Sequence, residues 1–487
     1  MRSKLQCGSI SRATSTAVAL AVVLLLVVVI SQSAQAQSYT VLHSFDNTDG
    51  FGPSAGLVQA TNGNLYGTTS SGGAKNVGTI FEITPAGALT SLYSFDDATT
   101  DGAFPFAGMV QAINGNLYGT TAGGGSRFYG TVFKTTPGGT LTILYSFCAQ
   151  PSCIDGAEPY AGLVQATNGD FYGTTAGGPF SGYGTVFKIT PDGTLTTLHN
   201  FDESDGEQSE GGLVQVTDGN LYGTTYNGGA DSGGTVFRIT PGGTFTLLYS
   251  FCVQPSCTDG ANPYGGLVQA TDRNLYGTTS SGGANEGGTI FKITLSGTLS
   301  TLYNFCVQIG CTDGLQPQAG LVQATDGNFY GTTIAGGTYG YGTIFQITPG
   351  GTLTTLHSFN LNLTDGAYPQ AVLVQATDGN FYGTTINGGT NNSCNGAECG
   401  TVFGLSMGLG PFVETNPTSG KVRTAVTILG TKLTGATSVT FNGKAAKFKV
   451  VSGSEITTTV PAGATTGKVK VKTTSGTLTS NVNFRVP

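Results

Sequence analysis

The chain has 487 residues, 78 of them glycine, with 38% hydrophobic and 10% charged residues and a formal net charge of -7. Its apolar and aromatic content excludes a disordered chain, and its length allows several domains. Residues 37–408 carry 7 Lys and Arg against 25 Asp and Glu, whereas residues 409–487 carry 10 against 2. This asymmetry favours two separate domains, and the acidic main region argues against nucleic acid as a partner.

The first 36 residues are typical of a secretory signal peptide. Three basic residues precede an apolar run at 17–30, and Ala-Gln-Ala at 34–36 offers a small-x-small cleavage site. The apolar run is shorter than the roughly 20 residues that span a bilayer, which disfavours the alternative of an uncleaved membrane anchor. We therefore predict an exported protein, extracellular, periplasmic or associated with the cell surface, with no transmembrane segment in its mature chain.

Residues 37–408 repeat one motif seven times, for example as GLVQATDGNFYGTT at 320–333. Equivalent tyrosines recur every 50 to 54 residues, a period typical of propeller blades. Tight turns at Asp326-Gly327 and Pro349-Gly350-Gly351 and one glycine-rich loop separate four extended segments in this copy. The segments are residues 320–325, 328–333, 342–348 and 352–359. Each copy is therefore predicted to form a four-stranded antiparallel sheet.

The order of these segments predicts how the repeats join. A fourth-strand motif, YTVLHSF, occurs at 39–45 before any first strand, and the last copy ends after its third strand at 400–403. An N-terminal strand that completes the last sheet explains both observations and removes exposed sheet edges. We predict an all-β protein with a seven-bladed β-propeller at 37–408, closed by its N-terminal strand.

Residues 409–487 differ from the repeats in sequence and in charge. Short alternating strands with frequent turn signals are typical of a small Ig-like β-sandwich. Seven lysines lie mostly on the predicted strand faces of this domain. We expect them to help hold the protein at an anionic envelope surface or against its own acidic repeats, with a merely solvated surface as the alternative.

The three histidines share one repeat position, because His43, His199 and His357 occupy the fourth-strand slot that holds tyrosine in the other copies. An interchangeable position indicates a structural role rather than catalysis. The chain also lacks a nucleophile-elbow motif with a matched base, and its glycine-rich loops lack the ending of a phosphate-binding loop. We predict no enzymatic activity; the alternative is a glycosidase, which needs two carboxylates at a defined separation in a cleft.

Seven Asp-Gly pairs lie in the loops that lead from one repeat to the next. Their carboxylates are candidate binding residues on one face, and the alternative is that each aspartate only stabilises its turn. These residues are Asp49, Asp101, Asp155, Asp205, Asp259, Asp313 and Asp365.

One of these loops, FDESDGEQSEGG, is unusually acidic. Its density of hard oxygen ligands suits Ca²⁺, although the spacing differs from that of an EF-hand. The candidate calcium ligands are Asp202, Glu203, Asp205, Glu207 and Glu210. No other metal or cofactor is expected.

Eight cysteines follow the predicted signal peptide, in four pairs with C-x4-C spacing. An exported protein meets an oxidising compartment, and each pair can close within one loop, so four local disulfides are predicted. A zinc site is the alternative, but it needs four converging ligands. The predicted disulfides are Cys148–Cys153, Cys252–Cys257, Cys306–Cys311 and Cys394–Cys399.

The repeated stretches GLVQATDGNFYGTT, GTVFKIT and LTILYSF resemble the GloVer tandem repeat of exported bacterial "choice-of-anchor" proteins, over residues 39–403. Residues 411–487 resemble an IPT/TIG domain, with Pro417, Gly420, Gly430 and Phe441 at matching positions. The first resemblance implies surface attachment through varied C-terminal devices. This sequence has neither a sortase motif nor a terminal apolar helix with a basic end.

These observations together predict a secreted or cell-surface protein that binds a surface glycan or a protein without catalysis. The blade-to-blade loops and the loops between second and third strands vary in length and content, whereas the turns on the other side are short and nearly uniform. We therefore expect the long-loop face to carry binding. The alternatives are a structural envelope component and a propeller-scaffold enzyme that acts on extracellular glycans.

Overall fold

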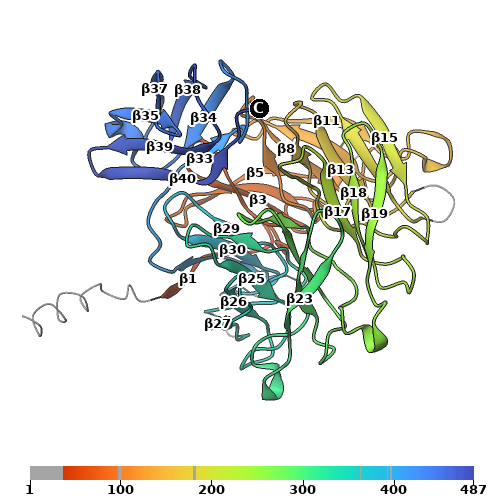
Figure 1. Cartoon of the computed structure of the whole chain (residues 1–487). Helices are drawn as coiled ribbons and strands as arrows, with labels where there is room; N and C mark the ends of the chain where they lie inside the picture. Colours follow the sequence, from red (N-terminus) through yellow and green to blue (C-terminus); the bar gives the residue numbers. More distant parts are fainter. Residues whose placement is uncertain (1–36, 97–100, 179–181, 362–363, 392, 395–397) are drawn as a thin grey trace, which may run out of the picture.

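The computed structural model describes residues 37–487 apart from 97–100, 179–181, 362–363, 392 and 395–397, so the predicted signal peptide lies outside the described residues. The described chain is all-β, with strands β1 to β40 and four short 3-10 helices (Figure 1). No helix in this described part is long and apolar enough to cross a membrane.

Seven four-stranded antiparallel sheets carry the repeated sequence, and we number them as repeat sheets 1 to 7. Repeat sheet 1 has the order β2 (Val58–Gln59), β3 (Leu65–Thr69), β4 (Thr79–Ile83) and β5 (Leu89–Ser94). The next five follow the same order: β7 (Val110–Gln111), β8 (Leu117–Thr121), β10 (Thr131–Thr135) and β11 (Leu141–Ser146) in sheet 2; β12 (Val164–Gln165), β13 (Phe171–Thr175), β14 (Thr185–Ile189) and β15 (Leu195–Asn200) in sheet 3; β16 (Val214–Gln215), β17 (Leu221–Thr225), β18 (Thr235–Ile239) and β19 (Phe245–Ser250) in sheet 4; β20 (Val268–Gln269), β21 (Leu275–Thr279), β22 (Thr289–Ile293) and β23 (Leu299–Asn304) in sheet 5; β24 (Val322–Gln323), β25 (Phe329–Thr333), β26 (Thr343–Ile347) and β27 (Leu353–Ser358) in sheet 6.

Repeat sheet 7 combines the two ends of the repeat region. It consists of β29 (Val374–Gln375), β30 (Phe381–Thr385), β32 (Thr401–Ser406) and the N-terminal strand β1 (Ser38–Ser44). Strand β1 pairs antiparallel with β32, with Tyr39 opposite Leu405 and Ser44 opposite Thr401. The N-terminal strand thus supplies the fourth strand that the last copy lacks, as the sequence predicted.

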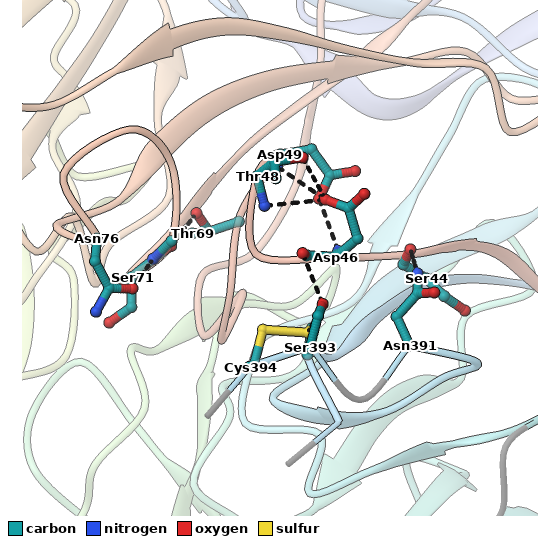
Figure 2. The surroundings of a disulfide bond; sticks show 12 residues. Ser44, Asp46, Thr48, Asp49, Thr69, Ser71, Asn76, Asn391, Ser393 and Cys394 are labelled. Carbon is teal, nitrogen blue, oxygen red and sulfur yellow. Dashed lines mark hydrogen bonds between the residues drawn. A yellow bond between two sulfur atoms is a disulfide. The ribbon is translucent and has the colours of Figure 1, made fainter. Parts of the chain in front are cut away.

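The loop before β32 fastens this N-terminal strand in place. Figure 2 shows Asn391, whose Nδ2 donates to the carbonyl of Ser44 at 3.0 Å, and Ser393, whose Oγ donates to the carbonyl of Asp46 at 2.7 Å. The disulfide of Cys394 closes the same loop. These contacts join residues about 350 positions apart in sequence.

The second strand of each sheet is buried along its whole length, which explains the uniform LYGTT or FYGTT sequence. A Cβ added at Gly67 would lie 2.5 Å from the ring of Phe81 and 2.7 Å from Leu57, so only glycine fits at this position. The hydroxyls of Thr69 and Thr79 meet at 2.8 Å across β3 and β4. The same threonine pair recurs in every repeat sheet.

Hydrogen bonds from the first strands join each repeat sheet to the next. Gln111 accepts from the backbone N–H of Thr61 in the preceding sheet at 2.9 Å, and its own amide donates to the carbonyl of Gly115. The equivalent glutamine makes the equivalent link at every junction. The seventh link runs from Thr377 to Gln59 at 2.9 Å, so the contacts of repeat sheet 7 return to repeat sheet 1.

Apolar clusters lie between adjacent sheets and follow the same order as the glutamine links. Tyr66 and Ile80 of repeat sheet 1 pack against Phe133 of repeat sheet 2. In the same arrangement, Phe45 beside β1 and Tyr382 of repeat sheet 7 belong to a cluster with residues of repeat sheet 1. Each sheet therefore buries its faces against both neighbours, and no repeat can form this core alone.

The first strands are shorter than predicted. The segment expected at 320–325 forms a strand only at Val322–Gln323, and the other first strands also have two residues. Before this strand the chain packs closely on the neighbouring sheet, since a Cβ at Gly320 would lie 2.7 Å from the carbonyl oxygen of Gly266. After the strand the chain enters its turn at once, because the backbone N–H of Gly327 donates to the carbonyl of Ala324 at 2.9 Å.

The C-terminal residues form two further four-stranded sheets around their own apolar core. One contains β33 (Glu414–Asn416), β34 (Ala425–Leu429), β38 (Glu455–Thr459) and β37 (Phe448–Val450); the other contains β36 (Lys444–Ala446), β35 (Ser438–Phe441), β39 (Gly467–Thr473) and β40 (Gly476–Phe484). The remaining elements are the pairs β6 (Gly102–Ala103) with β9 (Gly123–Gly124) and β28 (Gly366–Ala367) with β31 (Asn387–Gly388), and the 3-10 helices η1 (Pro151–Cys153), η2 (Pro255–Cys257), η3 (Ile309–Cys311) and η4 (Leu433–Gly435).

This C-terminal domain packs on the short-turn end of the first strands (Figure 1). Ser454 donates to the carbonyl of Thr61 at 2.7 Å, and Asn416 donates to the carbonyl of Gln111 at 3.2 Å. A cavity of about 350 Å³ lies between the first strands and β33, and Glu414 lines it. Within the described residues, the ion pairs join no lysine of this domain to the acidic repeats, and the contacts of Ser454 and Asn416 are hydrogen bonds between neutral groups.

Candidate functional site

A second cavity, of about 360 Å³, lies at the opposite end of the first strands, and all seven repeats line it. Each repeat contributes the short segment that leads into its first strand. The residue two positions before the Gly of GLVQ differs among the copies, and we call these seven the mouth residues. They are Ser54, Phe106, Tyr160, Glu210, Tyr264, Gln318 and Gln370.

Close backbone approach brings the mouth residues together. A Cβ at Gly108 would lie 2.7 Å from the carbonyl oxygen of Gly56, and Gly266 stands in the same relation to Gly212 at 2.8 Å. Seven successive segments therefore lie side by side without side chains at this position, apart from Val372 in the seventh copy. Side chains that precede these glycines surround one opening.

The mouth has two chemically different halves. Repeat sheets 2 to 5 contribute Phe106, Tyr160, Glu210 and Tyr264, and the Phe106 and Tyr160 rings lie 5.3 Å apart. Repeat sheets 6, 7 and 1 contribute neutral polar residues, and the amide of Gln370 donates to that of Gln318 at 2.8 Å. One half is thus aromatic and acidic, and the other is neutral and hydrogen-bonding.

Glu210 lies between tyrosines of the two adjacent sheets. Burial raises the pKa of its carboxyl group above the usual value, and the neighbouring Tyr264 hydroxyl opposes this shift. Burial and the charge of Glu210 in turn raise the pKa of Tyr264. Burial raises the pKa of Tyr160 too, with smaller contributions from Glu158 and Glu210. The carboxylate is therefore only partly solvated and faces phenols that stay neutral.

A second set of variable residues flanks the mouth, two positions earlier in each repeat. Phe104, Glu158 and Tyr368 have φ values of 58°, 56° and 58°, in the left-handed region that non-glycine residues rarely adopt. Each donates its backbone N–H to the loop of the preceding sheet, as Glu158 does to Tyr129 at 2.9 Å. Glu158, Tyr160 and Glu210 also line an adjoining cavity of about 500 Å³. Such strained positions are common next to functional sites.

The seven predicted binding aspartates each have a side-chain partner. Each carboxylate pairs with the tyrosine or histidine of the preceding fourth strand, as in Tyr145 to Asp155 and His199 to Asp205, both at 2.8 Å. Asp155 also accepts the backbone N–H of Ala149 at 2.9 Å. The other pairs are His43–Asp49, Tyr93–Asp101, Tyr249–Asp259, Tyr303–Asp313 and His357–Asp365.

Each of these seven carboxylates is therefore engaged in a hydrogen bond within its own repeat. They are buried or half-buried and fasten each fourth strand to the loop that follows it. The sequence could not show the pairing, because the partners belong to different elements. For the histidines, the expected structural role agrees with these contacts.

The five candidate calcium ligands do not converge on one point among the described residues. Asp202 accepts the backbone N–H groups of Ser204 and Asp205, and a further hydrogen bond from the Ser204 hydroxyl lowers the pKa of Asp202. Asp205 pairs with His199, Glu210 belongs to the mouth, and Glu203 is exposed. Glu207 forms an isolated bridge with Asn227. Over the described ranges, no three His, Cys, Asp or Glu residues are grouped to hold a metal ion.

All four predicted disulfides are present, and with the cysteines bonded in pairs the zinc alternative is wrong. Three of them close loops that follow fourth strands and contain η1, η2 and η3. Backbone N–H groups of such a loop bind the buried aspartate, as Val307 binds Asp313 at 3.1 Å. The tip of that loop exposes Ile309 almost completely, at 99%.

The mouth residues were missed by the sequence analysis, apart from Glu210, which was assigned to calcium. A signal for them exists, since they occupy one position after the loop proline in DG-x-x-P-x-[AG]-G, with Ser209 replacing the proline in the fourth copy and Val372 the last glycine in the seventh. A position-by-position comparison of the seven copies identifies this variable position. An analysis of the recurring residues alone overlooks it.

Comparison with known proteins places these observations in a family. The Gloeobacter/Verrucomicrobia repeat matches residues 28–153, 110–268, 149–312 and 306–438, and the IPT/TIG domain matches residues 412–486. No curated protein matches the sequence.

Solved structures resemble the chain in fold only. A streptogramin B lyase is 16% identical, with a TM-score of 0.51, and the match covers 77% of this chain and 99% of that one. A catalytically inactive virginiamycin B lyase from Staphylococcus aureus with quinupristin is also 16% identical, with a TM-score of 0.50 and coverage of 76% and 99%. At such identities the similarity concerns the fold alone, which is propeller-like. By the extent of the repeat match, the chain belongs to the Gloeobacter/Verrucomicrobia repeat family and ends in an IPT/TIG domain.

Proposed function

We propose that the protein is an exported binding protein in which the seven repeat sheets form a closed seven-bladed β-propeller and the mouth receives the ligand. Closure is supported by the glutamine links, since the seventh returns from Thr377 to Gln59. The pairing of β1 with β32 supports it as well. The disulfides are compatible with export, because such bonds persist in oxidising compartments.

One observation carries the binding proposal: the repeats are uniform where they build the framework and different where they line the mouth. The Gln of VQ, the Gly of YGTT and the Thr pairs recur in all copies and have structural partners. Equivalent mouth positions hold a phenylalanine, two tyrosines, a glutamate, two glutamines and a serine. Variation on a constant scaffold is what selective recognition of one ligand requires.

We further propose that binding is not accompanied by catalysis. The three histidines are engaged with aspartates near the fourth strands, away from the mouth. Among the described residues that line the mouth cavity Glu210 is the one carboxylate, and Glu158 joins it only in the adjoining cavity, whereas glycoside hydrolysis ordinarily uses two carboxylates on either side of one bond. Recognition of a surface glycan or a protein group needs the cavity and its polar and aromatic lining only.

Binding to the isolated envelope of the producing cell, and to a glycan array, tests this proposal. Tyr160→Ala and Tyr264→Ala should each reduce binding at least about tenfold, because stacked aromatic side chains dominate such contacts. The matched control is Tyr339→Ala, which removes an exposed tyrosine from another loop and should leave binding unchanged. Equal binding by all three variants would overturn the proposal.

A further inference from the structure

The acidic half of the mouth has a specific composition. Glu210 is flanked by Tyr160 and Tyr264 from the adjacent sheets, and Glu158 lies near Tyr160 in the adjoining cavity. Among the described residues that line the two cavities, there is no lysine, arginine or histidine. The surrounding repeats are acidic as well, with 25 Asp and Glu against 7 Lys and Arg over residues 37–408.

This arrangement disfavours two kinds of ligand. An anion would meet the charges of Glu210 and Glu158 with no cation to compensate them. A bare inorganic cation such as Ca²⁺ requires six or more oxygen ligands, whereas aromatic rings occupy the places beside Glu210.

An organic cation satisfies both parts of the lining. The negative faces of aromatic rings attract ammonium groups, and the attraction strengthens where water is excluded. A partly buried carboxylate is costly without a compensating charge, and an ammonium group beside it relieves that cost. The amides of Gln318 and Gln370 lie across the opening, where they can bind the polar remainder of such a ligand.

We propose that the mouth recognises its ligand through an organic ammonium group, quaternary or protonated, held against Glu210 between Tyr160 and Tyr264. The inference rests on the proposed function and adds the chemical class of the ligand. Amino sugars and quaternary ammonium compounds share this chemistry, and the cavity of about 360 Å³ has the size of an ordinary small-molecule site.

Calorimetric or NMR titration of the full chain with two matched pairs of probes tests this inference. Choline has the neutral isostere 3,3-dimethylbutan-1-ol, and glucosamine has the neutral N-acetylglucosamine. At least one cation should bind about tenfold or more tightly than its neutral counterpart, because only the cation gains the charge pairing and the cation–π contact. The better pair shows whether the group is quaternary or a protonated amine.

Variants locate the effect. Glu210→Gln should reduce cation affinity about tenfold, whereas Glu203→Gln, with the same charge change on an exposed residue of the same loop, should not. Tyr264→Phe keeps the aromatic face and should retain most of the affinity, and Tyr264→Leu should lose it. Unchanged amide spectra of the variants exclude misfolding as the cause.

The outcomes separate this inference from the proposed function. If neither cation binds, or the neutral probes bind equally well, while Tyr160→Ala abolishes envelope binding, the ammonium inference is wrong and the proposed function stands. If the mouth variants bind the envelope as well as the parent chain does, the proposed function is wrong, and the ammonium inference that rests on it is wrong too. Cation binding that survives Glu210→Gln also contradicts the inference.

Discussion

The two ends of the seven first strands differ in sequence and in surroundings. At the short-turn end, every strand finishes with the same glutamine, each bridging two sheets, and the C-terminal domain packs over several of them. At the mouth end, equivalent positions carry aromatic, acidic and amide side chains around an open cavity. Both ends belong to the same strands and the same repeats, so architecture alone does not explain the difference.

The comparison teaches where to look for function in a repeat protein. Residues that recur in all copies have partners that hold the sheets together, as Gln215 has Thr167 and Gly219. The mouth residues, which vary at one repeat position, do not hold the sheets together in this way. The mouth is therefore the place where a change should alter binding with little effect on folding, and the turn end should behave in the opposite way.

The largest effect on stability should come from the residue that follows the N-terminal strand. Phe45 is fully buried between repeat sheets 7 and 1, and its ring lies 5.2 Å from that of Phe81. Phe45→Ala should lower the free energy of unfolding by about 3–5 kcal/mol in denaturant titrations. Phe128→Ala, at an exposed loop position, should change it by less than about 1 kcal/mol, and similar losses for both would contradict the proposed closure.

Loss of one loop disulfide should have a smaller effect. Replacing Cys306 and Cys311 together by alanine should cost roughly 2 kcal/mol, since the bond closes a ring of only six residues. The loop lies on the long-loop face, so ligand affinity should fall along with thermal stability. Unaltered stability and affinity would show that these disulfides do not stiffen the face.

The cavity under the C-terminal domain predicts a dependence on pH. Burial raises the pKa of Glu414 from 4.5 to about 7, although Asn481 donates a hydrogen bond to the carboxylate at 3.0 Å. The folded state then holds a proton that the unfolded chain releases, so the stability from this group is lost as pH rises from about 4.5 to 7. We expect about 1–2 kcal/mol after allowance for partial exposure to the cavity.

Glu414→Gln provides the control for this prediction. It should remove this part of the pH dependence in urea titrations between the two pKa values and leave the rest of the profile unchanged. The same slope in both proteins would assign the dependence to other groups.

A smaller effect should distinguish two glutamines, one at the short-turn end of the first strands and one at the mouth. Gln215 bridges repeat sheets 3 and 4, so Gln215→Ala should destabilise by about 1 kcal/mol through lost hydrogen bonds. Gln318→Ala, at the mouth, should stay within about 0.5 kcal/mol in the same titration. A reversed order would mean that the framework and the mouth have been assigned to the wrong ends.

The framework was largely predictable from the sequence because its signals are local. Asp-Gly turns, the recurring tyrosines and the spare strand motif at 39–45 each lie within a few residues of the element they specify. The disulfides were predictable for the same reason, since Cys306 and Cys311 close within one loop.

The site was less predictable because its parts come from different repeats. Phe106 and Tyr264 are 158 positions apart and line the same cavity only because the repeat sheets are arranged around it. The aspartate contacts were not predictable either, because Asp313 and its partner Tyr303 lie on a loop and a strand whose relative placement the sequence does not show. The position of the C-terminal domain over the short-turn end carried no sequence signal.

A variant with a uniform mouth tests the central claim most directly. Ser54, Phe106, Tyr160, Glu210 and Tyr264 would all be replaced by glutamine, the residue already present in repeats 6 and 7. Envelope binding and the unfolding midpoint would be measured together on this variant and the parent chain. The account predicts lost binding with a midpoint lowered by no more than a few degrees. Two results would contradict the separation of framework and mouth: the variant still binds the envelope, or the variant no longer folds.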